Sequence, residues 1–142
     1  MKITPVHPEP PKSEHKMPFV PALAVEGGRT IWLAGCGPIP IYHKHPHDPF
    51  EEAEWLAGGF RTQCEKTFDN VEKILTSSGG DLTNIVKLTI YVTNVFRDQN
   101  ELNEITWERF GRENMPPRTL VEVSSLSHGD MLIEIDAIAV VP

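Results

Sequence analysis

The stretch PPRTLVEVSSLSHGDMLIEIDAIAVV, residues 116–141, decides the fold of this chain. Apolar and polar residues alternate over residues 118–123 and 132–141, which is typical of strands with one buried face. The segment SHGD, residues 127–130, carries turn-forming residues, so the sequence predicts that the two strands form a hairpin. Side chains on a strand alternate between faces, so we expect Arg118 and Leu120 to share a face, with Glu134 on the neighbouring strand.

The segments before this stretch predict two more short strands and a long helix. Residues 22–25 and 30–33 flank Gly27-Gly28, and paired glycines permit the backbone of a tight hairpin. Asp48-Pro49 is a typical helix start. Apolar residues then recur every three or four positions from residue 56 to residue 75, which predicts one long amphipathic helix ending at Gly79-Gly80.

The middle of the chain completes an α+β pattern. Residues 85–92 predict a half-buried strand, and Asp98 with Glu101 predicts the start of a second helix that ends near Gly111. This order favours a mixed β-sheet with two helices packed on one face. We expect the other face of such a sheet to be apolar and to need partner subunits.

Composition limits the classes of function. The chain has 142 residues, which suits one domain, and the proline-rich residues 1–17 predict an extended arm before a domain at 18–142. The formal net charge of −7 and the scattered basic residues disfavour a nucleic-acid partner. No apolar run near the start suits a signal peptide or membrane span, so we expect a cytoplasmic protein that does not bind a membrane.

The quoted stretch resembles the signature of the RidA family, in which Pro, any residue and Arg precede a VEV strand and an IEIEA strand. QCEKTFDNVEKILTSSGG (residues 63–80), VKLTIYV (86–92) and LNEITWERF (102–110) resemble that family's first helix, central strand and second helix. The resemblance spans roughly residues 18–141. It implies a chorismate-mutase-like fold and a homotrimer with ligand clefts between subunits.

The resemblance also implies roles for individual residues. Arg118 matches the arginine that binds the substrate carboxylate, and Glu134 matches the glutamate that positions the attacking water. Asn103 falls where the family often has an asparagine beside the cleft. Glu122 is the rival of Glu134 as the catalytic carboxylate, although VEV is more typical of an exposed edge.

Several substrate-binding positions depart from the family pattern. Phe19 replaces a tyrosine, Ala34 a serine and Leu120 a cysteine. The family's SGQIP becomes AGCGPIP, one residue longer, so that Cys36 enters the predicted pocket. Three polar contacts are lost, which favours a larger or more apolar substrate than the small imines of typical members.

Two functions from different classes remain open. The first is hydrolysis of a carboxylate-bearing imine or enamine to a carbonyl compound and ammonia, with no cofactor. The second is non-catalytic binding of small carboxylates in the same clefts. Ribonuclease activity fits poorly with the acidic composition. The histidines at 43, 45 and 47 have no recognised zinc spacing and Asp48 is expected to cap a helix, so the sequence predicts no metal site.

Overall fold

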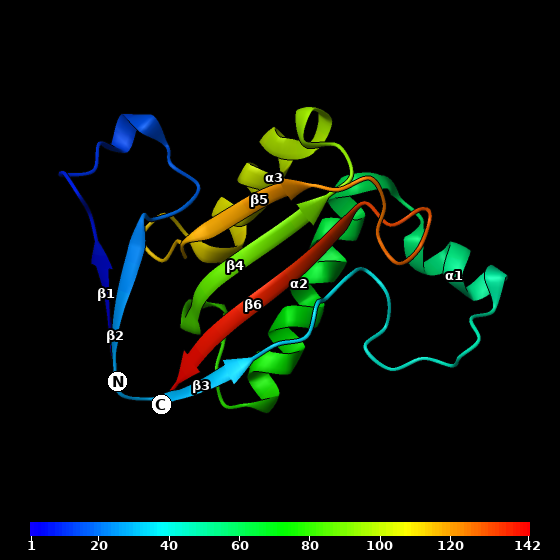
Figure 1. Cartoon of the computed structure of the whole chain (residues 1–142), viewed down its shortest axis with the longest axis horizontal. Helices are drawn as coiled ribbons and strands as arrows, with labels where there is room; N and C mark the ends of the chain where they lie inside the picture. The colour runs from blue at the N-terminus through cyan, green and yellow to red at the C-terminus, as the bar shows by residue number, and fades with distance from the viewer.

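The main sheet has four strands. The computed structural model describes all residues, 1–142. Its central sheet runs in the order β3 (Arg29–Trp32), β6 (Ile133–Val141), β4 (Ile85–Val92) and β5 (Arg118–Glu122), as Figure 1 shows. β6 is antiparallel to both of its neighbours, whereas β5 is parallel to β4. The predicted mixed sheet is therefore confirmed.

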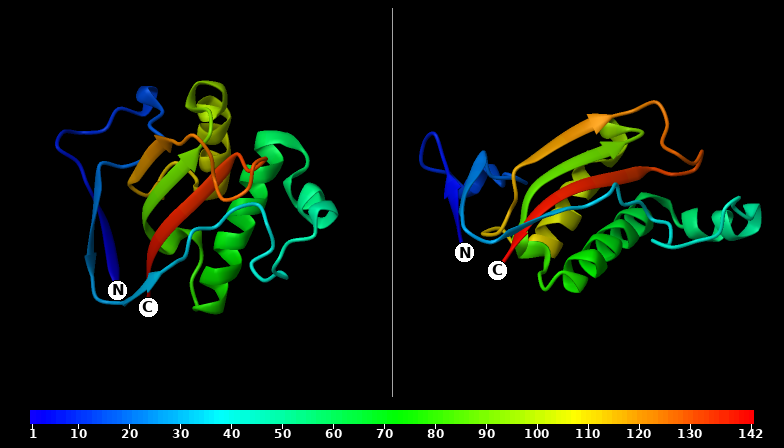
Figure 2. Two further views of the ribbon diagram at one scale, coloured as in Figure 1. Left: turned by 45° about the vertical axis from the view of Figure 1, so that its right-hand side comes forward. Right: turned by 60° about the horizontal axis from the view of Figure 1, so that its bottom comes forward.

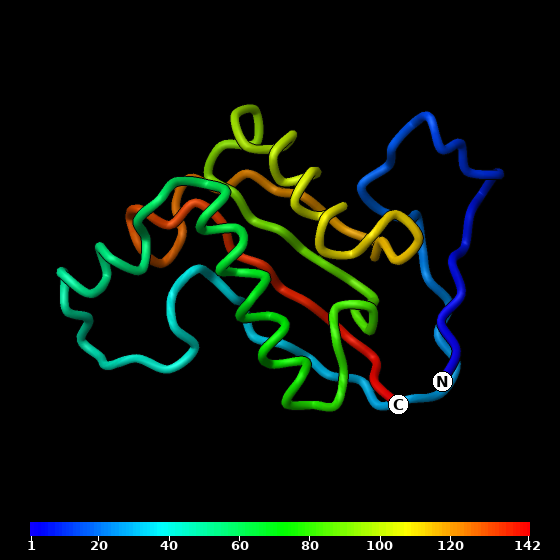
Figure 3. Tube along the Cα trace, turned by 180° about the vertical axis from the view of Figure 1, so that it is seen from behind, coloured from blue at the N-terminus to red at the C-terminus, as the bar shows by residue number.

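Two helices cover one face of this sheet. α2 (Gly59–Ser77) and α3 (Val95–Phe110) lie side by side against the strands, as Figures 2 and 3 show from two sides. The core between them combines alternate residues of β4 and β6 with the apolar stripe of α2, including Leu88, Ile90, Ile135, Phe68 and Val71. The α+β architecture with two helices on one face is confirmed.

The predicted hairpin of the last two strands is wrong, because β4 lies between β5 and β6. The chain passes from β4 through α3 to a parallel β5, which takes one edge of β4. β6 then pairs with the other edge. Turn residues between two strands indicate that the chain reverses, but they do not determine which strands become neighbours.

The predicted long helix is divided in two. α1 (Pro49–Leu56) has Ala57 as its C-cap, and α2 begins after Gly58. Gly58 and Gly59 have φ angles of 99° and 77°, in the left-handed region that glycine adopts without strain. The apolar spacing continues across this break, so periodicity alone did not reveal it.

The second helix begins earlier than predicted. α3 starts at Val95, and the side chain of Asn94 accepts a hydrogen bond from the Arg97 amide at 2.9 Å. Asp98 does not cap the helix. It is buried within the first turn and pairs with the Arg97 guanidinium at 2.7 Å.

The N-terminal strands form a separate ladder, and the predicted hairpin of residues 22–33 is wrong. β1 (Lys2–Val6) pairs with β2 (Ala22–Glu26), while β3 joins the main sheet by pairing with β6. The residues at 27–28 do turn the chain, but between two sheets (Figure 1). Two short 3₁₀ helices, η1 (Ser13–His15) and η2 (Leu82–Asn84), complete the chain.

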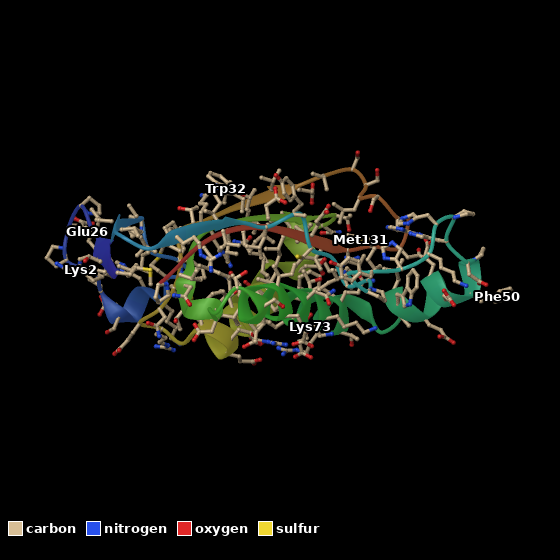
Figure 4. The ribbon with its side chains drawn as sticks, turned by 90° about the horizontal axis from the view of Figure 1, so that it is seen from below. Lys2, Glu26, Trp32, Phe50, Lys73 and Met131 are labelled. Carbon is tan, nitrogen blue, oxygen red and sulfur yellow. The ribbon has the colours of Figure 1, made fainter.

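The open face of the main sheet is not the apolar surface that was expected. Trp32 lies there, away from the helices, as Figure 4 shows. This residue is 75% exposed. It is accompanied by polar side chains: Lys87 Nζ donates to Thr119 Oγ1 at 2.8 Å, and the Tyr91 hydroxyl donates to Asp136 at 3.4 Å. None of the helices has the length and apolar character that a bilayer span requires.

Candidate active site

Glu134 lies on the open face of β6, and a neighbouring loop is fixed against it. Its register partner on β4 is Tyr91. On the other side, Cys36 and Ile135 exchange two backbone hydrogen bonds of 2.9 and 2.8 Å. This isolated bridge extends the sheet beyond β3 and places residues 34–37 beside the Glu134 side chain.

Gly35 supplies the space that Glu134 occupies. A Cβ atom at position 35 would lie 2.5 Å from Glu134 Oε1 and 3.1 Å from Asp136 Oδ1. The first distance is shorter than any van der Waals contact, so only glycine fits without displacing the carboxylate. The prediction of the site did not include Gly35, because its role depends on a strand that lies 99 residues further along the chain.

The environment of Glu134 favours the protonated form of its carboxyl group more than water does. Burial raises the pKa of Glu134, the nearby Asp136 raises it further, and His128 partly opposes both effects. Burial and the same two carboxylates raise the pKa of the Cys36 thiol to about 11. Cys36 is therefore a neutral thiol near pH 7 and is poorly suited to act as a nucleophile.

Glu134, Cys36 and Ala34 line one cavity of about 380 Å³. Its wall continues through the loop of residues 37–47 and the segment at 127–131. The buried amide of Asn70 holds that loop by donating to the carbonyls of Gly37 and Ile39, at 2.8 and 2.7 Å. Asn70 was not predicted. It lies on α2 beside the apolar residues, and no sequence motif marks it.

Arg118 occupies a different environment. It lies at the start of β5, where its guanidinium donates to Asn103 Oδ1 and, at 3.4 Å, to Thr106 Oγ1, both on α3. Burial lowers its pKa to about 10, so the group remains charged at neutral pH. No carboxylate of the chain pairs with it, whereas an arginine in partly buried surroundings usually has an anionic partner.

Two of the other predicted residues join Arg118. Asn103 contacts it directly, and Leu120 lies on the same face of β5, packed against the core. Phe19 is half-buried and is not part of the cavity beside Glu134. The alternative carboxylate, Glu122, is exposed at the end of β5 and accepts a hydrogen bond from the Val95 amide at 2.9 Å.

The predicted residues thus form two groups on opposite faces of the sheet. Arg118 is in register with Leu88, which is buried beneath the helices. Glu134 is in register with Tyr91, three residues further along β4. Residues three apart on a strand point to opposite faces. Within one chain, the cation and the carboxylate therefore cannot reach the same small ligand.

Comparison with known proteins agrees with this architecture. The family model described as endoribonuclease L-PSP matches residues 12–141. A RutC family protein of Pyrococcus abyssi is 38% identical over 116 residues, which are 82% of each chain. The human 2-iminobutanoate/2-iminopropanoate deaminase is 30% identical over 123 residues, 87% of this chain and 80% of that protein.

A solved structure shows the same fold. RidA from an Antarctic Psychrobacter species superposes with a TM-score of 0.65 at 28% identity, covering 87% of this chain and 88% of that one. Fold and sequence together define a Rid-type α+β protein. The chain belongs to the endoribonuclease L-PSP family, and the resemblance to RidA is confirmed. The family includes imine deaminases.

Proposed function

We propose that this protein hydrolyses carboxylate-bearing imines or enamines, in clefts formed between the subunits of a homotrimer. The observation that carries the proposal is the pairing of two complementary groups. Glu134 is a carboxyl of raised pKa in a cavity, and Arg118 is a partly buried guanidinium with no carboxylate of its own. A small anionic substrate needs both kinds of group.

The separation of these groups supports a site between subunits. Because Arg118 and Glu134 lie on opposite faces of one sheet, a ligand can contact both only if they come from different chains. The exposed Trp32 on the open face supports an interface there, because a large aromatic side chain is typical of contact surfaces. Light scattering tests the assembly directly and should give three times the 15.9 kDa chain mass.

The chemistry requires only a positioned water and a proton carrier. Arg118 would hold the substrate carboxylate by charge-assisted hydrogen bonds. Glu134 would take a proton from water as the oxygen attacks the imine carbon, and would deliver a proton to the nitrogen. In the resulting carbinolamine, Glu134 would take the hydroxyl proton and deliver it to the amino nitrogen, so that the C–N bond breaks, ammonia leaves and the carbonyl product forms.

The walls of the proposed cleft favour an apolar substrate body. Ala34 contributes a methyl group to the cavity, and Leu120 is apolar on the Arg118 side. Cys36 is an uncharged thiol. We therefore expect imino acids with larger apolar side chains to be better substrates than the small imines of typical family members.

Binding without turnover is the second candidate. It is favoured by Phe19, Ala34 and Leu120, which replace polar residues expected from the family pattern. Ribonuclease activity, which the family description names, is disfavoured by the net charge of −7.

One assay separates the two candidates. Imines are generated in situ from a panel of amino acids by an amino-acid oxidase, and ammonia release is followed with and without the protein. The proposed function predicts release above the spontaneous rate, largest for apolar side chains. Carboxylate binding without any acceleration would instead identify a binding protein.

A further inference from the structure

The histidines of this chain are concentrated in one place. Four of the six, at positions 43, 45, 47 and 128, meet beside the cavity, although 81 residues separate the last two. Ring centroids of neighbouring members are 4.6 to 4.7 Å apart. One nitrogen from each of His43, His45 and His47 lies within 4.8 Å of the other two.

The hydrogen bonds fix how these rings carry their protons. His43 Nδ1 lies 2.8 Å from the Pro40 carbonyl, which can only accept, so this nitrogen carries the hydrogen. His47 Nδ1 lies 3.1 Å from the Glu52 carboxylate, so it carries a hydrogen too. In the neutral rings, Nε2 of His43 and of His47 is therefore an unprotonated lone pair.

His47 Nε2 is the one buried side-chain nitrogen or oxygen of the chain that has no hydrogen-bond partner. An unsatisfied buried polar atom is costly and requires an explanation, of which a bound ion is one. The other nitrogen of the ring, Nδ1, has a second neighbour besides Glu52, because His128 Nε2 lies 2.7 Å from it. His128 Nδ1 in turn contacts Ser127 Oγ at 2.9 Å.

We propose that His43, His45 and His47 bind one divalent transition-metal ion of the zinc, cobalt or nickel class. Imidazole nitrogens are preferred ligands for these ions. A Glu52–His47–metal arrangement is the usual support for a histidine ligand, since the carboxylate fixes the tautomer and orients the ring. Ligand nitrogens around tetrahedral zinc are about 3.3 Å apart, so nitrogens at the 4.8 Å limit would need to approach by roughly 1.5 Å.

The proposed site differs from the expectation drawn from the sequence. Asp48 does cap α1, accepting from the Phe50 amide at 2.8 Å, and it is not part of the cluster. The supporting groups instead come from Glu52 on α1 and from His128 before β6. The spacing of residues in the sequence could not reveal that these segments meet in the fold. Three protein ligands leave a coordination position for water at the rim of the cavity that Glu134 also lines.

The test uses full-length, tag-free protein freed of metal by chelation, so that no other histidine tract contributes. Calorimetric titration with zinc chloride should give one ion per chain with a micromolar or tighter Kd. Copper(II) should quench Trp55 fluorescence, because this ring lies 5.4 and 5.7 Å from His43 and His47. The quenching should disappear in Trp55→Phe while the zinc affinity is retained.

Substitutions assign the ligands. His45 is exposed, so His45→Ala should fold normally and weaken zinc binding at least 100-fold. Glu52→Gln and His128→Ala remove orienting groups and should weaken it about 10- to 100-fold. His7→Ala, an exposed histidine on another part of the chain, is the matched control and should bind as wild type. Wild-type protein that binds zinc no more tightly than His45→Ala would overturn the proposal. Because the readout is metal binding, its outcome is independent of deaminase activity.

Discussion

Arg118 and Glu134 lie on opposite faces of one sheet, on strands that β4 separates. Arg118 points toward α3, where it contacts Asn103, whereas Glu134 points toward the loop of Gly35. The two residues with the strongest chemical rationale therefore belong to two half-sites. A catalytic site that uses both has to combine two subunits, and the consequences can be tested separately for each half.

Arg118→Ala tests the carboxylate-binding half. Loss of a charge-assisted contact, worth roughly 1.5 to 3 kcal/mol, should weaken binding of a carboxylate ligand about 10- to 150-fold. An uncharged amide analogue should be little affected. Binding is measured by calorimetry, with Arg112→Ala as the control, because Arg112 is an exposed arginine outside both half-sites. Equal loss for the acid and its amide would argue against a carboxylate site.

Glu134→Gln tests proton transfer. The variant keeps the shape of the side chain but cannot carry the proton, so turnover should fall about 10²- to 10⁴-fold while ligand binding persists. The pKa of Glu134 is raised in the folded state, so its contribution to stability declines as pH rises through the unfolded and then the folded pKa. At neutral pH the variant should thus have a Tm at least as high as wild type. Full deaminase activity in this variant would remove Glu134 from the mechanism.

Gly35→Ala tests the space beside Glu134. The added methyl would lie 2.5 Å from Glu134 Oε1, so the carboxylate or the loop must move. We expect activity to fall at least tenfold because the carboxylate is displaced, whereas the free energy of unfolding should change by less than about 1 kcal/mol, since the clash is with the end of a flexible side chain. Gly129→Ala is the control, because no atom lies within 4 Å of the Cβ that it would add. Activity that matches this control would show that the contact is unimportant.

The pH dependence of kcat tests the environment of Glu134. A general base acts in its ionised form, so activity should be lost as pH falls through a pKa above the ordinary value of 4.5. Asp136→Asn removes a charge that raises this pKa, and should move the acid limb to lower pH. Asp130→Asn makes the same change of charge on an exposed residue and should leave the limb in place. An unmoved limb in Asp136→Asn would assign it to another group.

The sequence predicted those features that follow from local patterns. Alternation along β4 and β6 identified the strands, and the stripe from Leu56 to Leu75 identified the helical region. Strand adjacency was mistaken, because a β4–α3–β5 crossover inserts β4 between the two strands that a turn had suggested as a pair. This mistake also placed Glu134 beside Arg118, a relation that the sheet does not allow.

In the candidate site, too, the sequence did not reveal contacts between distant segments. Arg118, Asn103 and Glu134 were predicted through family resemblance, and their roles are part of the proposal. Gly35, Asn70 and His128 were missed, because each acts through contacts with segments at least 31 residues away. Such contacts leave no periodic or motif signal in a single sequence.

Activity of mixed trimers tests the central claim most directly. Arg118→Ala and Glu134→Gln chains, whose activities alone should be strongly reduced at substrate concentrations below KM, are co-expressed in equal amounts, and the mixed assemblies are assayed on in situ imines. If each cleft takes Arg118 from one subunit and Glu134 from the next, half of the chains supply each intact group, and about one quarter of the clefts regain both. The account predicts recovery of about a quarter of wild-type activity. Mixed trimers no more active than the parent variants would show that the two residues do not meet across a subunit boundary.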